Sequence, residues 1–211
     1  MSINKLIKGH QNFNRDFNNN KEHLLKKLTN IQKPSTVFVS CCDSRVDPGM
    51  ITHANYGDIF VIRNVANIIP PLNDEHDTYH GTTSALEYAI NHLEVENLIV
   101  MGHSNCGGIK ALLADKFDDE KDSFIKDWIA ILNPIKKNIP YGLSEEEKLH
   151  FTEKEAIKHS LKNAFTFDFV KKRHDQGKLR VLGWYFDIEA GKMYQYCDIR
   201  QDFVDLCEHE I

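Results

Sequence analysis

Residues 97–108 read Asn-Leu-Ile-Val-Met-Gly-His-Ser-Asn-Cys-Gly-Gly. The apolar run at 97–102 is typical of a strand that is buried on both faces of a sheet. His103 follows this run directly, and Cys106 comes three residues later, where we expect a helix to begin and to continue through Leu113. A second apolar run, at 36–40, leads in the same way into Cys41. The two strands that decide the fold therefore end in residues that bind metals.

Strand and helix patterns alternate along the chain after Pro34. Strands are expected at 36–40, 58–62, 97–102 and 180–186, and helices at 81–93, 106–113, 121–132 and 144–176. Residues 193–197 follow the last of these strands after a Glu189-Ala190-Gly191 turn, which predicts an antiparallel hairpin. We therefore predict an α/β fold with a mostly parallel central sheet of four strands and one antiparallel edge strand, flanked by helices.

The chain is expected to form one domain over 1–211, in which a helical arm (1–33, with a helix at 5–31) precedes an α/β core (34–211). Leu24, Leu25 and Leu28 form the apolar stripe of that helix. Ser144 and Glu147 have the spacing of a capping box, and Gly177 is placed to end the last long helix, which has room for a break.

The composition restricts the classes of partner. Hydrophobic residues make up 41% of the 211 residues and charged residues 27%, which is ordinary for a globular protein. A formal net charge of -5 argues against nucleic acid and against an anionic membrane. The N-terminal segment lacks the apolar stretch of a secretory signal, and no stretch is long enough to span a bilayer, so we expect a cytoplasmic protein.

Cys41, His103 and Cys106 are predicted to bind one metal ion. The ends of neighbouring parallel strands lie at the same edge of a sheet, so these side chains converge if the two strands are neighbours. Two thiolates and an imidazole suit zinc but fill only three of its four positions. A structural zinc site is usually closed by four protein ligands, whereas a catalytic one keeps a position for water. The ligand set therefore indicates a catalytic site.

The other cysteines are expected to be packing residues. Cys42 follows Cys41 in an extended segment, so its side chain should point away from the metal. Cys197 and Cys207 have no metal-binding residues at short spacing. An odd total of five cysteines is consistent with reduced thiols and metal ligands, not with a set of disulfides.

Asp43 and Arg45 add a charged pair beside the first metal ligand. Asp43 lies on the same side of the extended segment as Cys41, and Arg45 is spaced to pair with it. A carboxylate there can accept a hydrogen bond from a metal-bound water, or can itself block the metal. A loop ion pair without function is the simpler alternative.

Three linked motifs resemble those of the β-class carbonic anhydrases, most closely the plant-like branch. They are Cys41-Cys42-Asp43-Ser44-Arg45, Arg63-Asn64-Val65-Ala66-Asn67 and His103-Ser104-Asn105-Cys106-Gly107-Gly108. The resemblance implies reversible hydration of carbon dioxide to bicarbonate and a proton by attack of zinc-bound hydroxide. It also implies one Zn2+ per chain on Cys41, His103 and Cys106, with Asp43 and Arg45 as a gating pair.

The resemblance further implies a small apolar substrate pocket and a second subunit. The residues that match the family's carbon dioxide pocket are Gln32, Phe60, Val65, Tyr88 and Gly107. In the family some of these come from a partner chain, which implies a homodimer or a tetramer built from dimers. His92 matches a proposed proton shuttle, although an exposed histidine on a helix is the simpler interpretation. Phe38 stands where the bicarbonate-inhibited branch has tryptophan, so no bicarbonate site of that type is expected.

Two other functions share the same metal ligands. One is a zinc hydrolase that acts on a related small molecule such as carbon disulfide. The other is a non-catalytic zinc-binding or redox-responsive protein that uses Cys41 and Cys42. The Asp43–Arg45 pair argues against the second, because a purely structural site does not need it. The pattern of residues 114–176 predicts helices but indicates no catalytic or metal-binding residue.

Overall fold

The computed structural model describes residues 1–211 except 21–23, 28–29, 73–80, 118, 122 and 209–211. It forms two compact units, residues 1–33 and residues 34–211. No helix of the described residues is long and apolar enough to cross a membrane.

The first unit contains two helices, α1 (Ile3–Asn19) and α2 (Leu24–Lys27). The prediction of one helix over 5–31 is wrong, because the backbone is extended at Asn20, with φ -97° and ψ 101°. Consecutive asparagines at 18–20 favour this ending, since their side chains compete for backbone hydrogen bonds. Two side chains of the predicted apolar stripe, Leu24 and Leu28, lie outside the described residues.

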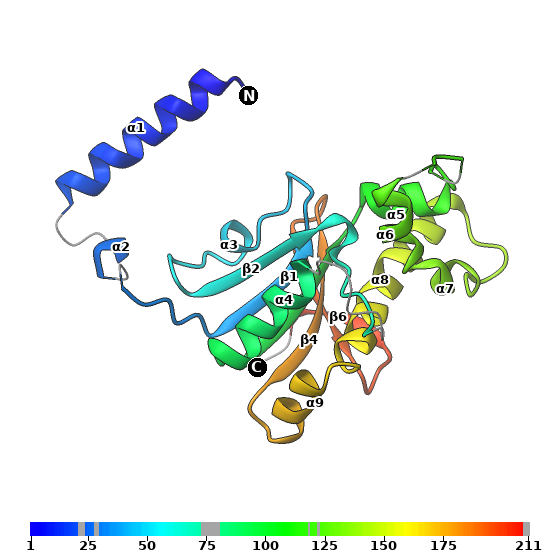
Figure 1. Ribbon diagram of the computed structural model, residues 1–211. Helices are drawn as coiled ribbons and strands as arrows, with labels where there is room; N and C mark the ends of the chain where they lie inside the picture. Colours follow the sequence, from blue (N-terminus) through cyan, green and yellow to red (C-terminus); the bar gives the residue numbers. More distant parts are fainter. Residues whose placement is uncertain (21–23, 28–29, 73–80, 118, 122, 209–211) are drawn as a thin grey trace. The chain divides into compact units, whose positions relative to one another are not determined.

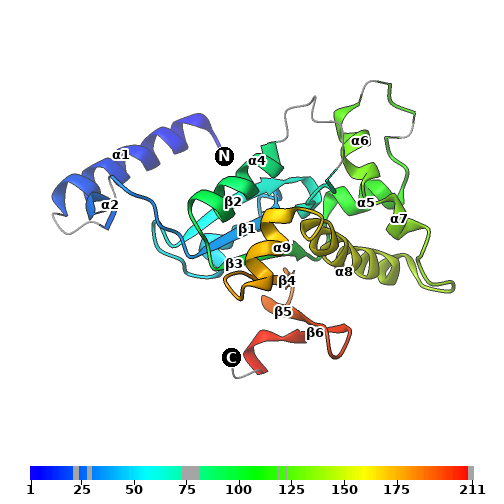
Figure 2. The same cartoon turned by 60° about the horizontal axis from the view of Figure 1, so that its bottom comes forward.

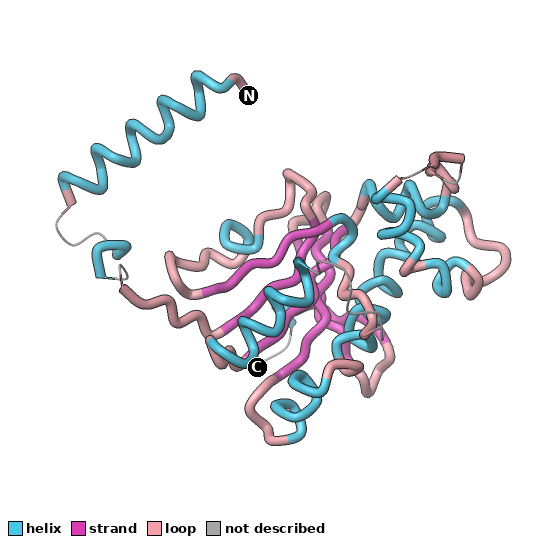
Figure 3. The backbone as a smooth tube through the Cα atoms, in the orientation of Figure 1, coloured by secondary structure: helices cyan, strands magenta, loops and turns pink. Residues whose placement is uncertain are grey.

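The second unit is built on a six-stranded sheet with the order β2-β1-β3-β4-β5-β6. Figures 1 and 3 show the backbone of this sheet. The strands are β1 (Thr36–Cys41), β2 (Ile59–Asn64), β3 (Asn97–His103), β4 (Arg180–Asp187), β5 (Lys192–Cys197) and β6 (Asp202–Asp205). The first four are parallel and the last two antiparallel. The predicted parallel sheet and the hairpin are confirmed. β6 was missed, because one Phe-Val pair between two aspartates is too short for a periodic signal.

One face of the sheet is covered by helices. These are α4 (Gly81–Glu87), α8 (Glu145–Ala164) and α9 (Asp168–Asp175) (Figure 2). Val37 and Val39 of β1 pack toward these helices, whereas Phe38 belongs to a second apolar cluster. This alternation follows from the two-residue period of a strand.

The remaining elements are short or continue a longer one. They are α3 (Pro48–Ile51), α5 (Gly107–Leu113), α6 (Phe124–Ala130), α7 (Asn133–Lys136), a 3-10 turn η1 (Val65–Asn67), a π-helical turn η2 (Tyr88–His92) that continues α4, and a 3-10 turn η3 (Leu206–Glu208). The predicted break in the last long helix is confirmed between α8 and α9. The capping box of Ser144 and Glu147 opens α8, and Gly177 has a positive φ of 68° after α9.

α8 approaches the sheet closely because two strand residues have no side chain. A Cβ added at Gly102 of β3 would lie 2.8 Å from Ile157 Cδ1 of α8. A Cβ at Gly183 of β4 would lie 2.9 Å from Ile157 Cγ2. Both contacts are shorter than van der Waals distance, so this packing requires glycine on both neighbouring strands.

Candidate metal centre

The ends of two adjacent strands bring the three predicted ligands together. Cys41 ends β1, His103 ends β3, and Cys106 is the residue before α5. One ligand atom from each residue lies within 4.8 Å of the other two, and the two Sγ atoms are 3.9 Å apart. All three side chains are buried. The cluster has the size and the donor set of a zinc site with three protein ligands.

His103 has one ring nitrogen free for a metal. Its Nδ1 lies 2.9 Å from the carbonyl oxygen of Ser104, so Nδ1 carries the proton and donates it. Its Nε2 is buried and has no hydrogen-bond partner among the described residues. A buried polar atom without a partner is costly, and a metal at this position would satisfy it. A backbone carbonyl that fixes the imidazole tautomer in this way is usual behind a metal ligand.

The two thiols differ in their affinity for a proton. The hydrogen bond from Cys106 lowers the pKa of Cys41, and His103 contributes in the same direction against the effect of burial. The same contact, together with burial, raises the pKa of Cys106, although the N–H groups of Gly108 and Ile109 oppose this rise. The lowered pKa of Cys41 favours its thiolate, which is the form that binds metals.

Asp43 and Arg45 form a two-armed ion pair beside the ligands. Arg45 Nε donates to Asp43 Oδ1 at 2.9 Å, and Arg45 Nη2 donates to Oδ2 at 2.7 Å. These hydrogen bonds are the main reason that the pKa of Asp43 lies far below its usual range. Asp43 Oδ2 lies 4.0 Å from His103 Nε2. The carboxylate is thus held next to the position of the metal by an arginine that occupies both of its oxygens.

Arg63 holds the loop that carries this pair. Its Nε donates to the carbonyl of Cys41 at 3.0 Å, and its Nη2 donates to those of Asp43 and Val46, each at 2.7 Å. One guanidinium therefore binds three carbonyls of a single loop. Arg63 belongs to a predicted motif, but no role for it could be inferred from the sequence.

Two of the predicted pocket residues lie close to the ligands. Val65 packs in the same apolar cluster as Cys41 and Cys106, and Gly107 follows Cys106 directly. The carbonyl of Val65 accepts a hydrogen bond of 2.8 Å from Trp128 Nε1 of α6. A Cβ at Gly108 would lie 2.7 Å from Val65 Cγ1, so the second glycine of the pair is needed for this contact.

The other predicted site residues lie elsewhere. Phe60, Tyr88 and His92 form a chain of rings, with centroids 6.2 Å apart for the first pair and 5.5 Å for the second. Phe60 pairs with Val37, four residues before Cys41, which is roughly 13 Å away along the strand direction. Gln32 is exposed and belongs to the first unit. Within one chain, the structure therefore does not unite this aromatic group with the metal ligands.

A buried carboxylate behind Cys106 was missed from the sequence. Glu153 Oε1 accepts a hydrogen bond from the backbone N–H of Cys106 at 2.9 Å, and only 2% of Glu153 is exposed. A signal was present, because Glu153 lies on the helical stripe of Leu149, Ala156 and Ile157, all of them buried. A charged residue on an apolar stripe indicates a specific partner.

Three expectations about cysteine are corrected. Cys42 and Cys207 are exposed and Cys197 is only half-buried, so none is a fully buried packing residue. Cys42 is not a member of the group that could hold a metal, and it is exposed to solvent instead of packed in the core. Of the described residues, only Cys41, His103 and Cys106 form a group that could hold a metal.

The chain was compared with known proteins. The family model described as "Carbonic anhydrase" matches residues 36–193. A carbonic anhydrase of Helicobacter pylori strain J99 is 39% identical over 181 residues, which are 83% of this chain and 81% of that protein. The β-carbonic anhydrase CcaA has a solved structure with a TM-score of 0.88 and 35% identity, covering 96% of this chain and 98% of that one.

A third comparison extends the likeness to fungi. A β-carbonic anhydrase of Sordaria macrospora, described as tetrameric, gives a TM-score of 0.77 at 25% identity, with 91% of this chain and 95% of that one covered. The matched segment contains all three ligand residues, and the sheet that places them is the one shared with these structures. The chain belongs to the β-carbonic anhydrase family, the enzymes that reversibly hydrate carbon dioxide to bicarbonate.

Proposed function

We propose that this chain hydrates carbon dioxide at one zinc ion held by Cys41, His103 and Cys106. The observation that carries the proposal is the convergence of three buried donors, one of them an imidazole nitrogen that has no hydrogen-bond partner among the described residues. Three protein ligands leave a fourth position for water. When bound, zinc lowers the pKa of that water to about 7 and so supplies a hydroxide nucleophile at neutral pH.

Asp43 is inferred to orient the attacking oxygen. Its Oδ2 is close enough to the metal position to accept a hydrogen bond from a water there. Arg45 donates to both carboxylate oxygens and so restrains the carboxylate in this position. Arg45 is itself held by the carbonyl of Asn105, at 3.1 Å from its Nη2. An oxygen nucleophile at the metal position that donated a hydrogen bond to Asp43 would be oriented with a lone pair toward the carbon of the substrate. Arg45 keeps Asp43 from becoming a fourth ligand.

The substrate pocket is inferred to form between two copies of the chain. Val65 and Gly107 lie next to the ligands, whereas Phe60 and Tyr88 lie about 13 Å along the sheet. A second copy can supply Phe60 of the partner subunit and Tyr88 of the partner subunit to complete an apolar cavity. The tetrameric description of the Sordaria relative supports a dimer or a tetramer built from dimers. Sedimentation velocity on the purified chain tests this, and a monomer that is fully active would refute it.

Three further assignments remain proposals. Gln32 is the candidate hydrogen-bond donor to a substrate oxygen, and His92, which is exposed, is the candidate for proton transfer to buffer. A turnover rate that does not depend on buffer concentration would argue against His92. The third proposal is a cytoplasmic location, which fractionation of the cell tests.

The decisive experiment measures zinc and activity on the same preparation. We expect about one zinc per chain and stopped-flow hydration of carbon dioxide far above the rate in buffer, increasing with pH as hydroxide forms. Carbon disulfide is offered in parallel. Zinc-loaded protein that hydrolyses carbon disulfide but does not hydrate carbon dioxide would support the alternative hydrolase, and loss of both activities would favour a non-catalytic zinc protein.

A further inference from the structure

Glu153 is a buried acid at the back of the metal centre. It comes from α8, and its Oε1 accepts the backbone N–H of Cys106 at 2.9 Å. The two residues are 47 positions apart in the chain. This bond joins α8 to the segment that carries the third ligand, before α5 begins.

The second oxygen of this carboxylate is also occupied. Tyr185 of β4 donates its hydroxyl to Glu153 Oε2 at 2.9 Å, and His150 Nδ1 lies 3.3 Å from the same oxygen. His150 Nδ1 is also 3.0 Å from the Tyr185 hydroxyl. Burial, followed by the charge of Glu153, raises the pKa of Tyr185, so the phenol keeps its proton and donates it. Glu153 is therefore fixed at both oxygens by groups from two other places in the fold.

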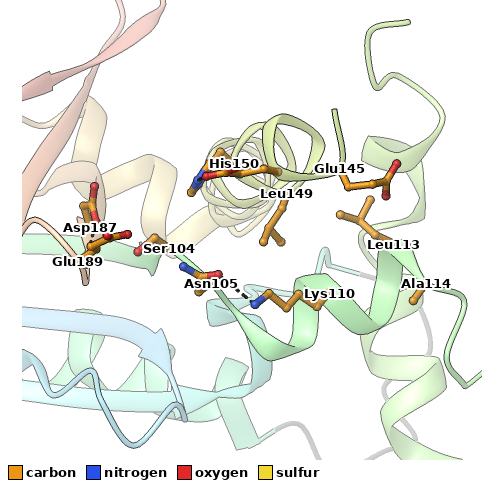
Figure 4. Close-up of a pocket in the computed structure, with 11 residues that line it drawn as sticks. Ser104, Asn105, Lys110, Leu113, Ala114, Glu145, Leu149, His150, Asp187 and Glu189 are labelled. Atoms are coloured by element: carbon orange, nitrogen blue, oxygen red, sulfur yellow. Dashed lines mark hydrogen bonds and ion pairs between the residues drawn. The ribbon is translucent and has the colours of Figure 1, made fainter. Parts of the chain in front are cut away.

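The network ends at the surface through His150. That residue lines a pocket of about 600 Å3 together with Ser104, Asn105 and Lys110, whose side chain donates to Asn105 Oδ1 at 3.0 Å (Figure 4). Of the residues that line this pocket, His150 is the one that contacts the Glu153 carboxylate. The contacts that fix its carboxylate are the three described above, from Cys106, Tyr185 and His150.

A buried carboxylate of this kind is costly for the fold. Removing a charge from water is unfavourable unless it is paired, and an apolar residue at such a position is often neutral or stabilising. Leu149, Ala156 and Ile157 show that the same face of α8 accepts apolar side chains. The stability of α8 therefore does not explain why a carboxylate stands at this buried position, whereas its hydrogen bond to the backbone of Cys106 does.

We propose that Glu153 is a positioning residue for the metal ligand Cys106. By holding the N–H of Cys106, it fixes the backbone from which the thiol projects, while the N–H groups of Gly108 and Ile109 remain for the sulfur. Groups behind a metal ligand commonly contribute 10- to 100-fold to metal affinity. This inference rests on the proposed metal site but not on the proposed reaction.

The test compares two variants that differ in one hydrogen-bond acceptor. Glu153→Met keeps the approximate shape of the side chain and removes the acceptor, whereas Glu153→Gln keeps an amide oxygen for Cys106 N–H. Glu155→Met is the matched control, because Glu155 is on the same helix and its side chain bonds to Lys158. Zinc affinity is measured by competition with a chromogenic chelator. The thiolate-to-cobalt absorption band of the cobalt-loaded protein reports the geometry of the ligands.

We expect Glu153→Met to weaken zinc binding roughly 10- to 100-fold and to shift the cobalt band. Glu153→Gln should have a zinc affinity and a cobalt band close to those of the unaltered protein, and so should Glu155→Met. The proposal fails if Glu153→Met binds zinc normally, or if Glu153→Gln is impaired to the same degree. If Glu153→Met does not fold, Tyr185→Phe decides, because it removes one donor to Glu153 without touching Cys106. Several-fold weaker zinc binding supports the role, and unchanged binding overturns it.

The two proposals fail in different ways. Wild-type protein that holds zinc but does not hydrate carbon dioxide would refute the reaction and leave the role of Glu153 intact. Normal zinc affinity in Glu153→Met would refute the role of Glu153 and leave the reaction intact.

Discussion

Residues 36–108 and residues 124–175 contribute to the same centre in different ways. The first region supplies every predicted metal ligand, and it does so from strand ends and from short sequence spacings. The second region supplies no ligand. Instead its polar side chains, which are buried or half-buried, bond to the backbone of the first: Glu153 to Cys106, Trp128 to Val65 and Ser160 to Ile69.

The difference between the two regions shows which part of the molecule fixes the geometry of the three ligand residues. Ligands at the ends of two parallel strands are brought near each other by the sheet alone. Holding them at a fixed geometry takes hydrogen bonds from a separate layer, because loops and strand ends leave backbone groups without partners. A helix whose buried face contains Glu, Ser and Asn provides those partners.

The largest effect should come from the ligand region. Cys106→Ser should reduce zinc affinity by more than the roughly 100-fold ascribed to residues behind a ligand, and hydration of carbon dioxide should fall with it. Metal analysis after dialysis and stopped-flow assays measure both. Cys42→Ser is the control, since Cys42 is an exposed neighbour of a ligand and should behave as the unaltered protein. Full zinc content in Cys106→Ser would contradict the site.

A smaller effect is expected in the supporting region. Ser160 Oγ accepts from the N–H of Ile69 at 3.1 Å and donates to the carbonyl of Asn67 at 3.2 Å. Ser160→Ala leaves both buried groups without this partner, so the free energy of unfolding should fall by about 1–3 kcal/mol. Urea denaturation measures it. Ser84→Ala, at an exposed site, should have little effect, and equal losses in both variants would show that α8 does not support the turn at 65–67 through this bond.

The smallest effect should be a pH-dependent one at the start of α8. The bond from the Ser144 backbone, with that from its side chain, lowers the pKa of Glu147 below its usual value of 4.5. The folded state therefore binds this proton less tightly than the unfolded chain. The stabilisation is complete above pH 4.5 and is lost as the pH falls through the lower pKa of the folded state.

Glu147→Ala should accordingly cost stability at neutral pH and less at acid pH, as measured by denaturation at both. Glu147→Gln is the comparison, because it keeps an oxygen for the N–H of Ser144 and does not titrate. A cost of Glu147→Ala that is the same at both pH values would contradict the capping role of the carboxylate.

The sequence predicted those features that depend on short spacings. Apolar runs predicted the four parallel strands, and the residues that follow two of them predicted the group that could hold a metal. The spacing of Asp43 and Arg45 is likewise local, and the structure shows the pair. β6 is too short to give a periodic signal, and α1 is shorter than the predicted helix because the asparagines at 18–20 favour its ending.

The bonds from α8 could not be predicted in the same way. Periodicity indicates which residues of a helix are buried, but it does not identify their partners. Glu153 and Cys106 are 47 residues apart, and Asn163 and Ile69 are 94 residues apart. Only the packing of α8 on the sheet determines which backbone groups those side chains reach.

That packing has a consequence for two residues with no functional group at all. Gly102 and Gly183 set the height of α8 above the sheet, since a single methyl group on either would overlap Ile157. Ile157 lies one turn beyond Glu153 on the same helix. The distance from the Glu153 carboxylate to the backbone of Cys106 therefore depends on the absence of a methyl group at these two positions. We expect a larger residue at either glycine to weaken metal binding, although neither glycine is a metal ligand.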